Sequence, residues 1–179
     1  ISQSTADDLT NLLHIPSAKI DLAVPGVEAR FQPLPAAEIE HFRAQKGLPD
    51  RFMLFVGTIE ARKNLPVLLR AYAAVPAADR AIVHLILAGG KGWLSDDVPR
   101  TVEQFGLGDS VHLPGYVADK DLPLWYNAAE TFVYPSVYEG WGLPVTEAMA
   151  CGTPVIVSNA SALPEAVGEA GLCVPPDNV

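Results

Sequence analysis

The 179-residue sequence predicts an α/β protein, in which a Rossmann-like parallel sheet carries helices on both of its faces. Two observations support this fold class. Short, almost wholly apolar runs bounded by turn residues recur along the chain, and stretches with apolar residues three and four positions apart lie between them. Strands that are apolar on both faces are typical of a parallel sheet that is covered by helices on either side.

The predicted strands and helices alternate from residue 38 to the end of the chain. The strands are expected at 52–56, 82–88, 111–113, 131–134, 154–157 and 172–174. The helices are expected at 38–45, 65–75, 98–105, 122–129, 143–150 and 163–167. Because ligands bind beyond the carboxyl ends of parallel strands, the loops that follow the strands form the candidate site.

The first part of the chain differs from the rest. Residues 1–23 are expected to form a short strand and a helix capped by Ser4 and Thr5, too small to fold alone. Residues 24–37, interrupted by prolines, are expected to be an extended interdomain linker. Residues 38–179 are expected to be the α/β domain, truncated at its C-terminus, because the chain lacks an initiator Met and stops soon after an apolar run.

The charge balance excludes some classes of partner. The chain has 12 Lys and Arg against 21 Asp and Glu, a net charge of −9, so a phosphate-backbone footprint and a nucleic-acid partner are not expected. Its apolar runs are far shorter than the ~18–20 residues needed to cross a bilayer, and its first residues do not resemble a signal peptide. We therefore expect no transmembrane segment.

Cysteine and histidine residues offer little sign of a metal site. Cys151 and Cys173 lie in separate apolar segments and are expected to be buried thiols in a reducing compartment. His84 and His112 lie in predicted strands, and the other two histidines are expected at the surface, at positions 14 and 41. Since no histidine clusters with carboxylates at ligand spacing, no metal is expected.

The most informative segment leads from the strand at 131–134 into the helix at 143–150. A loop with Gly140 and Gly142 precedes the helix, and glycines let a ligand approach the backbone closely. The free N–H groups of the helix start, at Gly142 and Leu143, are expected to bind an anion. Glu139 and Glu147 are better matched to hydroxyl groups, and Glu147 can lean back toward the helix start to meet a vicinal pair. The alternative is that Glu147 is a solvated helix residue and Glu139 a helix cap.

This segment resembles a known family, the retaining glycosyltransferases of family four, which have the GT-B fold. Residues 139–155 carry its two glutamates with seven residues between them, in a loop and helix that end Glu-Ala-Met-Ala-Cys-Gly-Thr-Pro-Val. Further similar stretches are 55–65, 87–93, 115–117 and 158–165. The resemblance implies that the chain is the C-terminal half of a GT-B glycosyltransferase. On this view residues 38–179 bind a nucleotide sugar and residues 1–23 are a remnant of the N-terminal acceptor domain.

The resemblance also implies roles for individual residues. Glu139 would contact the donor sugar and stabilise the reacting centre, and Glu147 would hold the ribose hydroxyls. The remaining donor-binding residues would be Gly57, Thr58, Gly140, Trp141, Gly142, Leu143, Tyr116 and Val117. The run at 89–92 lacks the ending of a phosphate-binding loop and is expected to be a strand-end turn.

Arg62 and Lys63 are the only adjacent basic pair of this acidic chain. Cations are disfavoured at a helix start unless an anion binds there, so the pair is expected to neutralise the diphosphate leaving group. Many family members have an arginine directly after the loop glycine, where this sequence has Thr58. Lys63 matches the family lysine, and Arg62 is assumed to supply the missing cation.

The expected function is therefore transfer of a hexose, with mannose favoured, from a nucleoside-diphosphate sugar to an acceptor hydroxyl with retention. GDP-mannose is expected ahead of UDP sugars, without a cofactor, in polysaccharide biosynthesis. A glycan or lipid-linked acceptor would bind through the missing N-terminal domain, so the isolated fragment is expected to be inactive. The full-length protein is expected to be cytoplasmic and peripheral at the inner membrane face.

Other functions stay open at this point. The chain could be a non-catalytic sugar-nucleotide-binding module, or an epimerase or phosphorylase with the same architecture. A nicotinamide-dependent oxidoreductase has little support, because the loop after the first strand lacks the Gly-x-Gly-x-x-Gly pattern.

Overall fold

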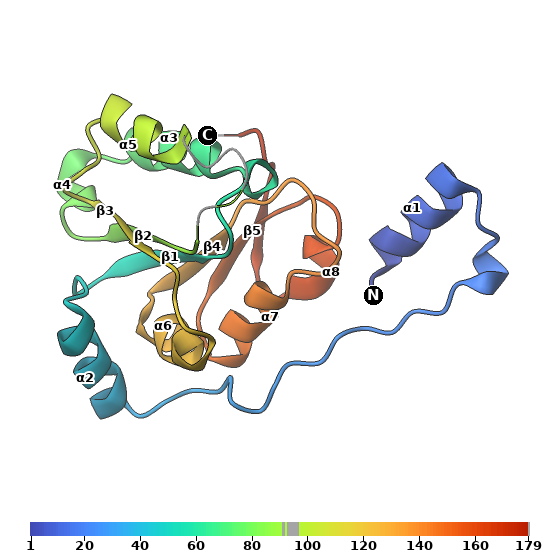
Figure 1. Cartoon of the computed structure of the whole chain (residues 1–179), viewed down its shortest axis with the longest axis horizontal. Coiled ribbons are helices and arrows are strands. Elements are labelled where there is room, and N and C mark those ends of the chain that lie inside the picture. The colour runs from blue at the N-terminus through green and yellow to red at the C-terminus, as the bar shows by residue number, and fades with distance from the viewer. Residues whose placement is uncertain (91, 93–96, 179) are drawn as a thin grey trace.

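The computed structural model describes residues 1–90, 92 and 97–178. It contains a six-stranded, wholly parallel sheet with the strand order β3-β2-β1-β4-β5-β6 (Figure 1). The strands are β1 Phe52–Val56, β2 His84–Ala88, β3 Val111–Gly115, β4 Thr131–Tyr134, β5 Val155–Ser158 and β6 Leu172–Val174. The predicted fold class is confirmed.

Helices α2 to α8 cover both faces of the sheet, and α1 lies apart from it. The helices are α1 Gln3–Leu13, α2 Ala36–Lys46, α3 Leu65–Ala74, α4 Ala77–Arg80, α5 Asp97–Gln104, α6 Leu122–Ala128, α7 Leu143–Ala150 and α8 Leu163–Val167. Figure 1 shows α3, α4 and α5 on one face, and α2, α6, α7 and α8 on the other. Helix α4 was not predicted, because four residues are too few to show an apolar period.

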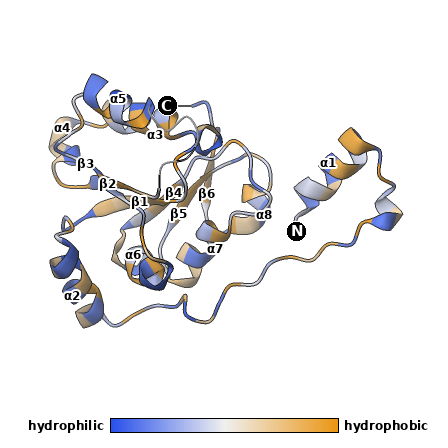
Figure 2. Cartoon of the chain, in the orientation of Figure 1, coloured by the Kyte–Doolittle hydropathy of each residue, from blue (hydrophilic) through white to orange (hydrophobic). Residues whose placement is uncertain are grey.

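The strands form because their side chains are apolar on both faces. Figure 2 shows the central strands as largely hydrophobic, whereas the helices carry hydrophilic as well as hydrophobic residues. Leu54, Phe55, Leu85 and Leu87 of β1 and β2 have no exposed surface. Full burial of one such side chain stabilises the fold by about 1.5–3 kcal/mol, so the two central strands anchor the core.

The order of the strands fixes the place of a site. From β1 the chain runs outward through β2 to β3, and then returns through α6 to β4 on the other side of β1. The direction of winding therefore reverses between β1 and β4. Open α/β sheets bind ligands at such a switch point, beyond the carboxyl ends of the strands.

Residues 1–23 contain α1 and a short 3₁₀ turn at Ser17–Lys19, but not the predicted strand. The predicted cap is also wrong. Helix α1 begins one turn earlier, and the hydroxyl of Ser2 accepts from the Thr5 amide at 3.0 Å. Ser2 can take this role because its backbone is extended, as a residue at the N-cap requires.

A carboxylate of α8 holds the start of α1. The amides of Gln3 and Ser4 each donate to Glu165 at 2.7 Å. The hydroxyl of Tyr138, in the loop after β4, donates to Asp8 at 2.6 Å. Helix α1 therefore meets the rest of the molecule mainly through charged and polar groups, and Figure 1 shows it set apart at the end of a long extended segment.

That extended segment, which covers most of the predicted linker, runs up to α2. The helix starts at Ala36, two residues before the predicted start. Phe31 is buried, the Leu34 amide donates to the Asn127 side chain at 2.9 Å, and Asn127 donates back to the Gln32 carbonyl at 3.0 Å. The second half of the segment is thus fixed on α6.

Two histidines meet across neighbouring strands. The Nδ1 atom of His84 lies 2.7 Å from Nε2 of His112, and the rings stack with centroids 5.0 Å apart. One of these nitrogens must donate and the other accept, so the contact does not survive protonation of both rings. Burial and then the charge of His84 lower the pKa of His112 below its usual 6.5.

We expect the free energy of unfolding to fall as the pH drops below about 6.5, because the unfolded chain then binds a proton that folded His112 resists. The contribution is complete above that pH and is lost toward the lower pKa of the folded chain. Urea midpoints between pH 5 and 7.5 measure it. His112→Asn should flatten the slope and the exposed control His41→Asn should not; equal slopes in all three proteins would contradict this.

Candidate functional site

Three of the predicted residues meet at the switch point of the sheet. Lys63 ends a 3₁₀ turn, Ala61–Lys63, that follows β1, and only 5% of its surface is exposed. Its Nζ atom donates to Glu139 Oε1 at 2.6 Å, and Arg62 Nη1 lies 2.7 Å from the same oxygen. Glu139, in the loop after β4, is also buried. Residues from two distant loops therefore share one carboxylate oxygen.

Other residues complete this cluster, and sequence reasoning missed them. The hydroxyl of Tyr134, at the end of β4, accepts from Lys63 Nζ. Arg62 also pairs with Glu60 at 2.7 Å, and the Glu139 amide donates to the Ser161 hydroxyl at 2.8 Å. In the sequence Tyr134 reads as one more aromatic residue of an apolar strand, which gives no sign of its polar contact.

The charges of the cluster stabilise one another against the cost of burial. Burial alone would raise the pKa of Glu139, but hydrogen bonds from Lys63 and Arg62 outweigh it and hold this pKa below its usual value. Burial lowers the pKa of Lys63, although the hydrogen bond to Glu139 opposes this. Glu139 is therefore an ion-pair partner and not a helix cap, since the N-cap of α7 is Gly142.

A cavity of about 200 Å³ lies beyond the carboxyl ends of β1, β2 and β3, and Gly57 in its lining lies next to the side chain of Lys63. Its lining brings together four predicted donor-binding residues, Gly57, Thr58, Tyr116 and Val117, with Val56, Gly89, Gly90, Asp119 and Leu122. The strand-end turn that was predicted after β2 therefore borders the cavity, although Lys91 and Trp93 lie outside the described residues.

Gly89 shows why this edge of the sheet needs glycine. A Cβ atom there would lie 1.8 Å from the carbonyl oxygen of Gly57, which is a severe clash with backbone. The loops after β1 and β2 can approach this closely only without a side chain. The close approach brings their backbone groups to the cavity.

Glu147, the fifth residue of α7, is half-buried and not the solvated residue of the alternative interpretation. The hydroxyl of Tyr126 donates to its Oε2 atom at 2.8 Å. Burial raises the pKa of Glu147, and the Tyr126 hydrogen bond opposes this. Nearby, Arg30 of the extended segment pairs with Asp119 at the cavity at 2.6 Å.

The start of α7 has the backbone that its glycine predicts. Gly142 has φ +102°, and a Cβ atom there would lie 2.7 Å from Leu163. Among residues 1–90, 92 and 97–178, no side chain makes an N-cap hydrogen bond to this helix. Leu143 is exposed, and the buried Nε1 atom of Trp141 has no partner among the described residues. Gly140 packs against Ile1.

A row of aromatic rings joins the two polar halves of the site. Neighbouring ring centroids lie 5.9, 5.4, 5.7 and 5.7 Å apart along the row. Its members are Phe31, Tyr126, Phe132, Tyr134 and Phe55. The hydroxyl of Tyr126 donates to Glu147, and the hydroxyl of Tyr134 accepts from Lys63. The packed rings therefore hold these two hydroxyls at a fixed separation.

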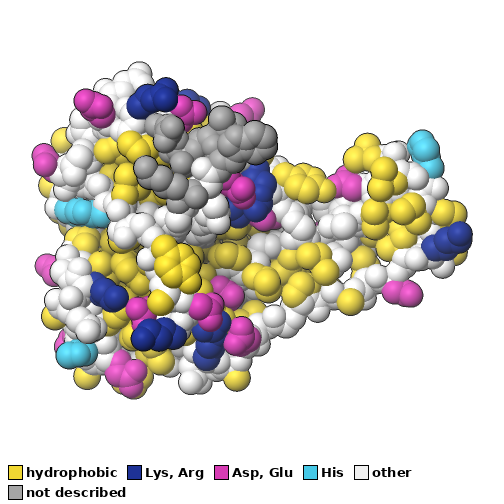
Figure 3. Space-filling view, viewed as in Figure 1, with side chains coloured by type: hydrophobic (Ala, Val, Ile, Leu, Met, Phe, Trp, Pro, Cys, Tyr) yellow, Lys and Arg dark blue, Asp and Glu magenta, His cyan; other side chains and the backbone are white. Residues whose placement is uncertain are grey.

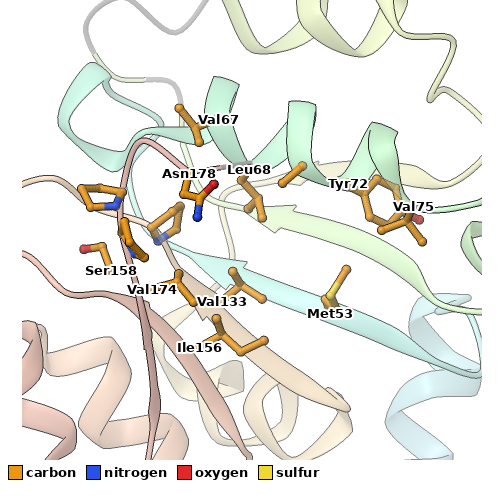
Figure 4. Close-up of a pocket in the computed structure, with 14 residues that line it drawn as sticks. Met53, Val67, Leu68, Tyr72, Val75, Val133, Ile156, Ser158, Val174 and Asn178 are labelled. Atoms are coloured by element: carbon orange, nitrogen blue, oxygen red, sulfur yellow. The ribbon is translucent and has the colours of Figure 1, made fainter.

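A second, apolar cavity of about 230 Å³ lies between α3 and the sheet (Figure 4). Met53, Val133 and Ile156 line it from the strands, and Leu68 and Tyr72 line it from α3. None of the predicted site residues borders it. None of its lining residues in the described part of the chain is charged, so they offer no match to a phosphate.

Within the described residues, no helix is long and apolar enough to span a membrane, and no group of three or more His, Cys, Asp or Glu is placed to hold a metal. On the face in Figure 3, basic side chains are scattered among acidic ones. Cys151 is buried, and burial raises its pKa to about 11. The prediction of a buried Cys173 is wrong, because β6 is the last strand of the sheet and leaves this thiol half-exposed.

Comparison with known proteins identifies the family. The family model described as "Glycosyl transferases group 1" matches residues 37–179. The chain belongs to this family. It is 49% identical over 128 residues to O-antigen chain mannosyltransferase B of Escherichia coli, a match that covers 72% of this chain and 34% of that protein.

One further relative and one solved structure are similar to this chain. Serotype-specific mannosyltransferase WbdA of Escherichia coli is 34% identical over 172 residues, which cover 94% of this chain and 21% of that protein. The fold matches Anabaena Alr3699/HepE, solved in complex with UDP and glucose, with a TM-score of 0.87 and 22% identity over 99% of this chain and 48% of that one. This chain thus covers between about a fifth and a half of the length of these three proteins.

The ion-pair cluster predicts a stability effect. Glu139→Gln leaves the buried Lys63 ammonium without its carboxylate, so we expect the free energy of unfolding at pH 7 to fall by about 2–4 kcal/mol. Because the pKa of Glu139 lies below 4.5 in the folded chain, the difference from wild type should be complete above pH 4.5 and vanish as the pH falls through the folded value.

Chemical unfolding at pH 7 and at pH 3.5 measures this difference. The matched control is Glu103→Gln, which changes an exposed glutamate of α5 and should leave stability unchanged. A Glu139→Gln protein as stable as wild type at pH 7 would show that the pair contributes nothing to folding.

Proposed function

We propose that this chain is the donor-binding part of a retaining hexosyltransferase that moves mannose from GDP-mannose to an acceptor hydroxyl in polysaccharide synthesis. The observation that carries the proposal is the cluster of Lys63, Arg62 and Glu139 at the switch point, beside a cavity at the same sheet edge. The two mannosyltransferase relatives support a mannose donor.

The two cations suit the departure of a diphosphate. When the bond between the anomeric carbon and the diphosphate oxygen breaks, negative charge develops on the phosphate, and fixed positive charges stabilise it. Lys63 is held in place by two acceptors, and Arg62 is shared between Glu60 and Glu139. The proposed reaction relies on these two cations and includes no metal or cofactor.

Retention follows if the acceptor attacks from the face that the diphosphate leaves. The acceptor oxygen then bonds to the anomeric carbon, and its proton passes to the departing phosphate oxygen. Glu139, bound by both cations, would lie at the donor sugar and stabilise the reacting centre. The anomeric configuration of the product, compared by NMR with that of the donor, tests retention.

The cavity and Glu147 suit the nucleoside. Glu147 would accept from the ribose hydroxyls, and Tyr116 and Val117 would flank the base. Asp119 adds a carboxylate to the cavity lining. Guanine offers neighbouring N–H groups on one edge, which a carboxylate can accept together, whereas uracil offers a single N–H between two carbonyls. This contrast favours GDP over UDP.

The acceptor requires further parts of the protein. A glycan or lipid-linked acceptor would bind through an N-terminal domain, and the whole protein would be cytoplasmic and peripheral at the inner membrane face. We expect the chain by itself to bind the donor without turnover.

Thermal unfolding with GDP, UDP and ADP tests the site and the base together. A nucleotide at about 100 times its dissociation constant stabilises the folded chain by about 2.7 kcal/mol, which is roughly 5–10 °C at this size. We expect the largest shift with GDP. A larger shift with UDP would overturn the choice of base, and no shift with any nucleotide would count against the site.

Glu147→Ala tests the ribose contact. We expect GDP binding to weaken by about 1.5–3 kcal/mol, as for hydrogen bonds to a charged group. Isothermal titration calorimetry measures this, with Glu103→Ala on α5 as the control that should bind like wild type. Unchanged affinity in Glu147→Ala would remove this residue from the site.

A further inference from the structure

Two buried tyrosine hydroxyls hold the two charged halves of the site. Tyr134 is 1% exposed, and its hydroxyl accepts from Lys63 Nζ. Tyr126 has no exposed surface, and its hydroxyl donates to Glu147 Oε2 at 2.8 Å. Each hydroxyl thus makes its contact with one residue that the proposed function assigns to the donor.

The rings leave these hydroxyls little freedom to move. The ring of Tyr134 stacks on Phe55 at an interplanar angle of 18° and on Phe132 at 23°. The ring of Tyr126 meets Phe132 edge-on at 83° and lies 5.9 Å from Phe31. All of these rings belong to the core, so a shift of either hydroxyl requires repacking of the core.

For Lys63 the consequence is a directed donor. Its ammonium has three N–H groups, of which one goes to Glu139 and one to Tyr134. Neither acceptor can move freely, so the direction of the third N–H is fixed. The Lys63 stem lies beside Gly57, a residue of the cavity, with Cε 3.7 Å from where a Cβ of that glycine would be.

For Glu147 the consequence is that its two carboxylate oxygens have different roles. Oε2 accepts from Tyr126, which fixes the plane of the group and leaves Oε1 to accept from a ligand. Without the Tyr126 hydroxyl the carboxylate could turn about its last bond. Both tyrosines therefore act through a neighbouring charged group and not by direct contact with a ligand.

We propose that Tyr134 and Tyr126 are positioning residues of the donor site, Tyr134 aiming Lys63 at the diphosphate and Tyr126 aiming Glu147 at the ribose. The inference rests on the proposed function. It predicts a separate effect on affinity for each hydroxyl. Loss of the Tyr134 hydroxyl should weaken only the contact with the diphosphate, and loss of the Tyr126 hydroxyl should weaken only the contact with the ribose.

The test compares Tyr134→Phe, Tyr126→Phe and the control Tyr72→Phe by calorimetry of the 179-residue chain. Tyr72 is similarly buried, but its hydroxyl donates to the Val83 carbonyl at 2.9 Å. Val83 precedes β2, so this contact lies at the amino ends of the strands, away from the site. The ligands are GDP, GMP and 2′-deoxy-GDP. The GDP-to-GMP affinity ratio reports the diphosphate contact, and the ratio of GDP to 2′-deoxy-GDP reports the ribose contact.

We expect Tyr134→Phe to lower the GDP-to-GMP affinity ratio by about fivefold and to leave the ratio of GDP to 2′-deoxy-GDP unchanged. Without the Tyr134 hydroxyl the Lys63 ammonium is no longer held in one direction, which weakens its interaction with the diphosphate. Tyr126→Phe should do the reverse, with a loss of about threefold in the ribose ratio, because only one hydrogen bond is loosened. Tyr72→Phe should change neither ratio. If all three ligands weaken by one common factor, the tyrosines are only structural and the inference fails.

Lys63→Met separates this inference from the function beneath it. If Lys63→Met removes the preference for GDP over GMP while Tyr134→Phe keeps it, the positioning role is wrong and the proposed function stands. If Lys63→Met also keeps the preference, the proposed function itself fails.

Labelling with 3-fluorotyrosine gives a second measurement that does not depend on how the two phenylalanine variants fold. Substitution of the other three tyrosines assigns their ¹⁹F resonances and leaves those of Tyr126 and Tyr134. GDP should change the ¹⁹F chemical shift of one of these two tyrosines, and GMP should leave that chemical shift unchanged. Identical responses to GDP and GMP at both resonances would overturn the inference.

Discussion

The ammonium of Lys63 lies almost wholly inside the protein, and an isolated buried charge costs several kcal/mol. It is tolerated because Glu139 and Tyr134, both at or after the end of β4, accept from it. The loop after β1 must therefore lie against the loop after β4. The strand order meets this requirement, because β1 and β4 are neighbours in the sheet. The cluster and the topology thus depend on each other.

The apolar strands supply the rigid support that the polar cluster needs. Because the sheet is covered on both faces, aromatic side chains of β1 and β4 pack on one another instead of facing water. The hydroxyl at the edge of this packing is the only polar part of Tyr134. The positions of the charged groups in the site therefore depend on how the aromatic rings of the hydrophobic core pack.

Much of the fold was readable in the sequence. The strands at 52–56, 131–134 and 172–174 and the helices at 143–150 and 163–167 have the predicted bounds, because Gly and Pro mark their ends and apolar residues fill their lengths. The loops that carry Lys63 and Glu139 were also identified from charge and glycine spacing. Their direct contact was not, because it joins residues 76 positions apart and depends on the strand order.

The burial of Lys63 and the roles of the two tyrosines lay beyond sequence reasoning for a related reason. A tyrosine in an apolar run has the same local pattern whether its hydroxyl reaches water, a carbonyl or a lysine. The cap of α1 was misplaced because Ser2, Ser4 and Thr5 are all acceptable caps, and the choice among them is made by where the helix begins.

The contact of Glu165 with the start of α1 has a consequence for the order of folding. It joins groups 161 and 162 positions apart, and closing so long a loop in an unfolded chain costs on the order of 4–5 kcal/mol. A few exposed, charge-assisted hydrogen bonds do not offset that cost. Once the sheet has formed, however, only the extended segment before α2 remains to be closed, and the same bonds suffice. We therefore expect helix α1 to dock last, onto a surface that the rest of the chain has already built.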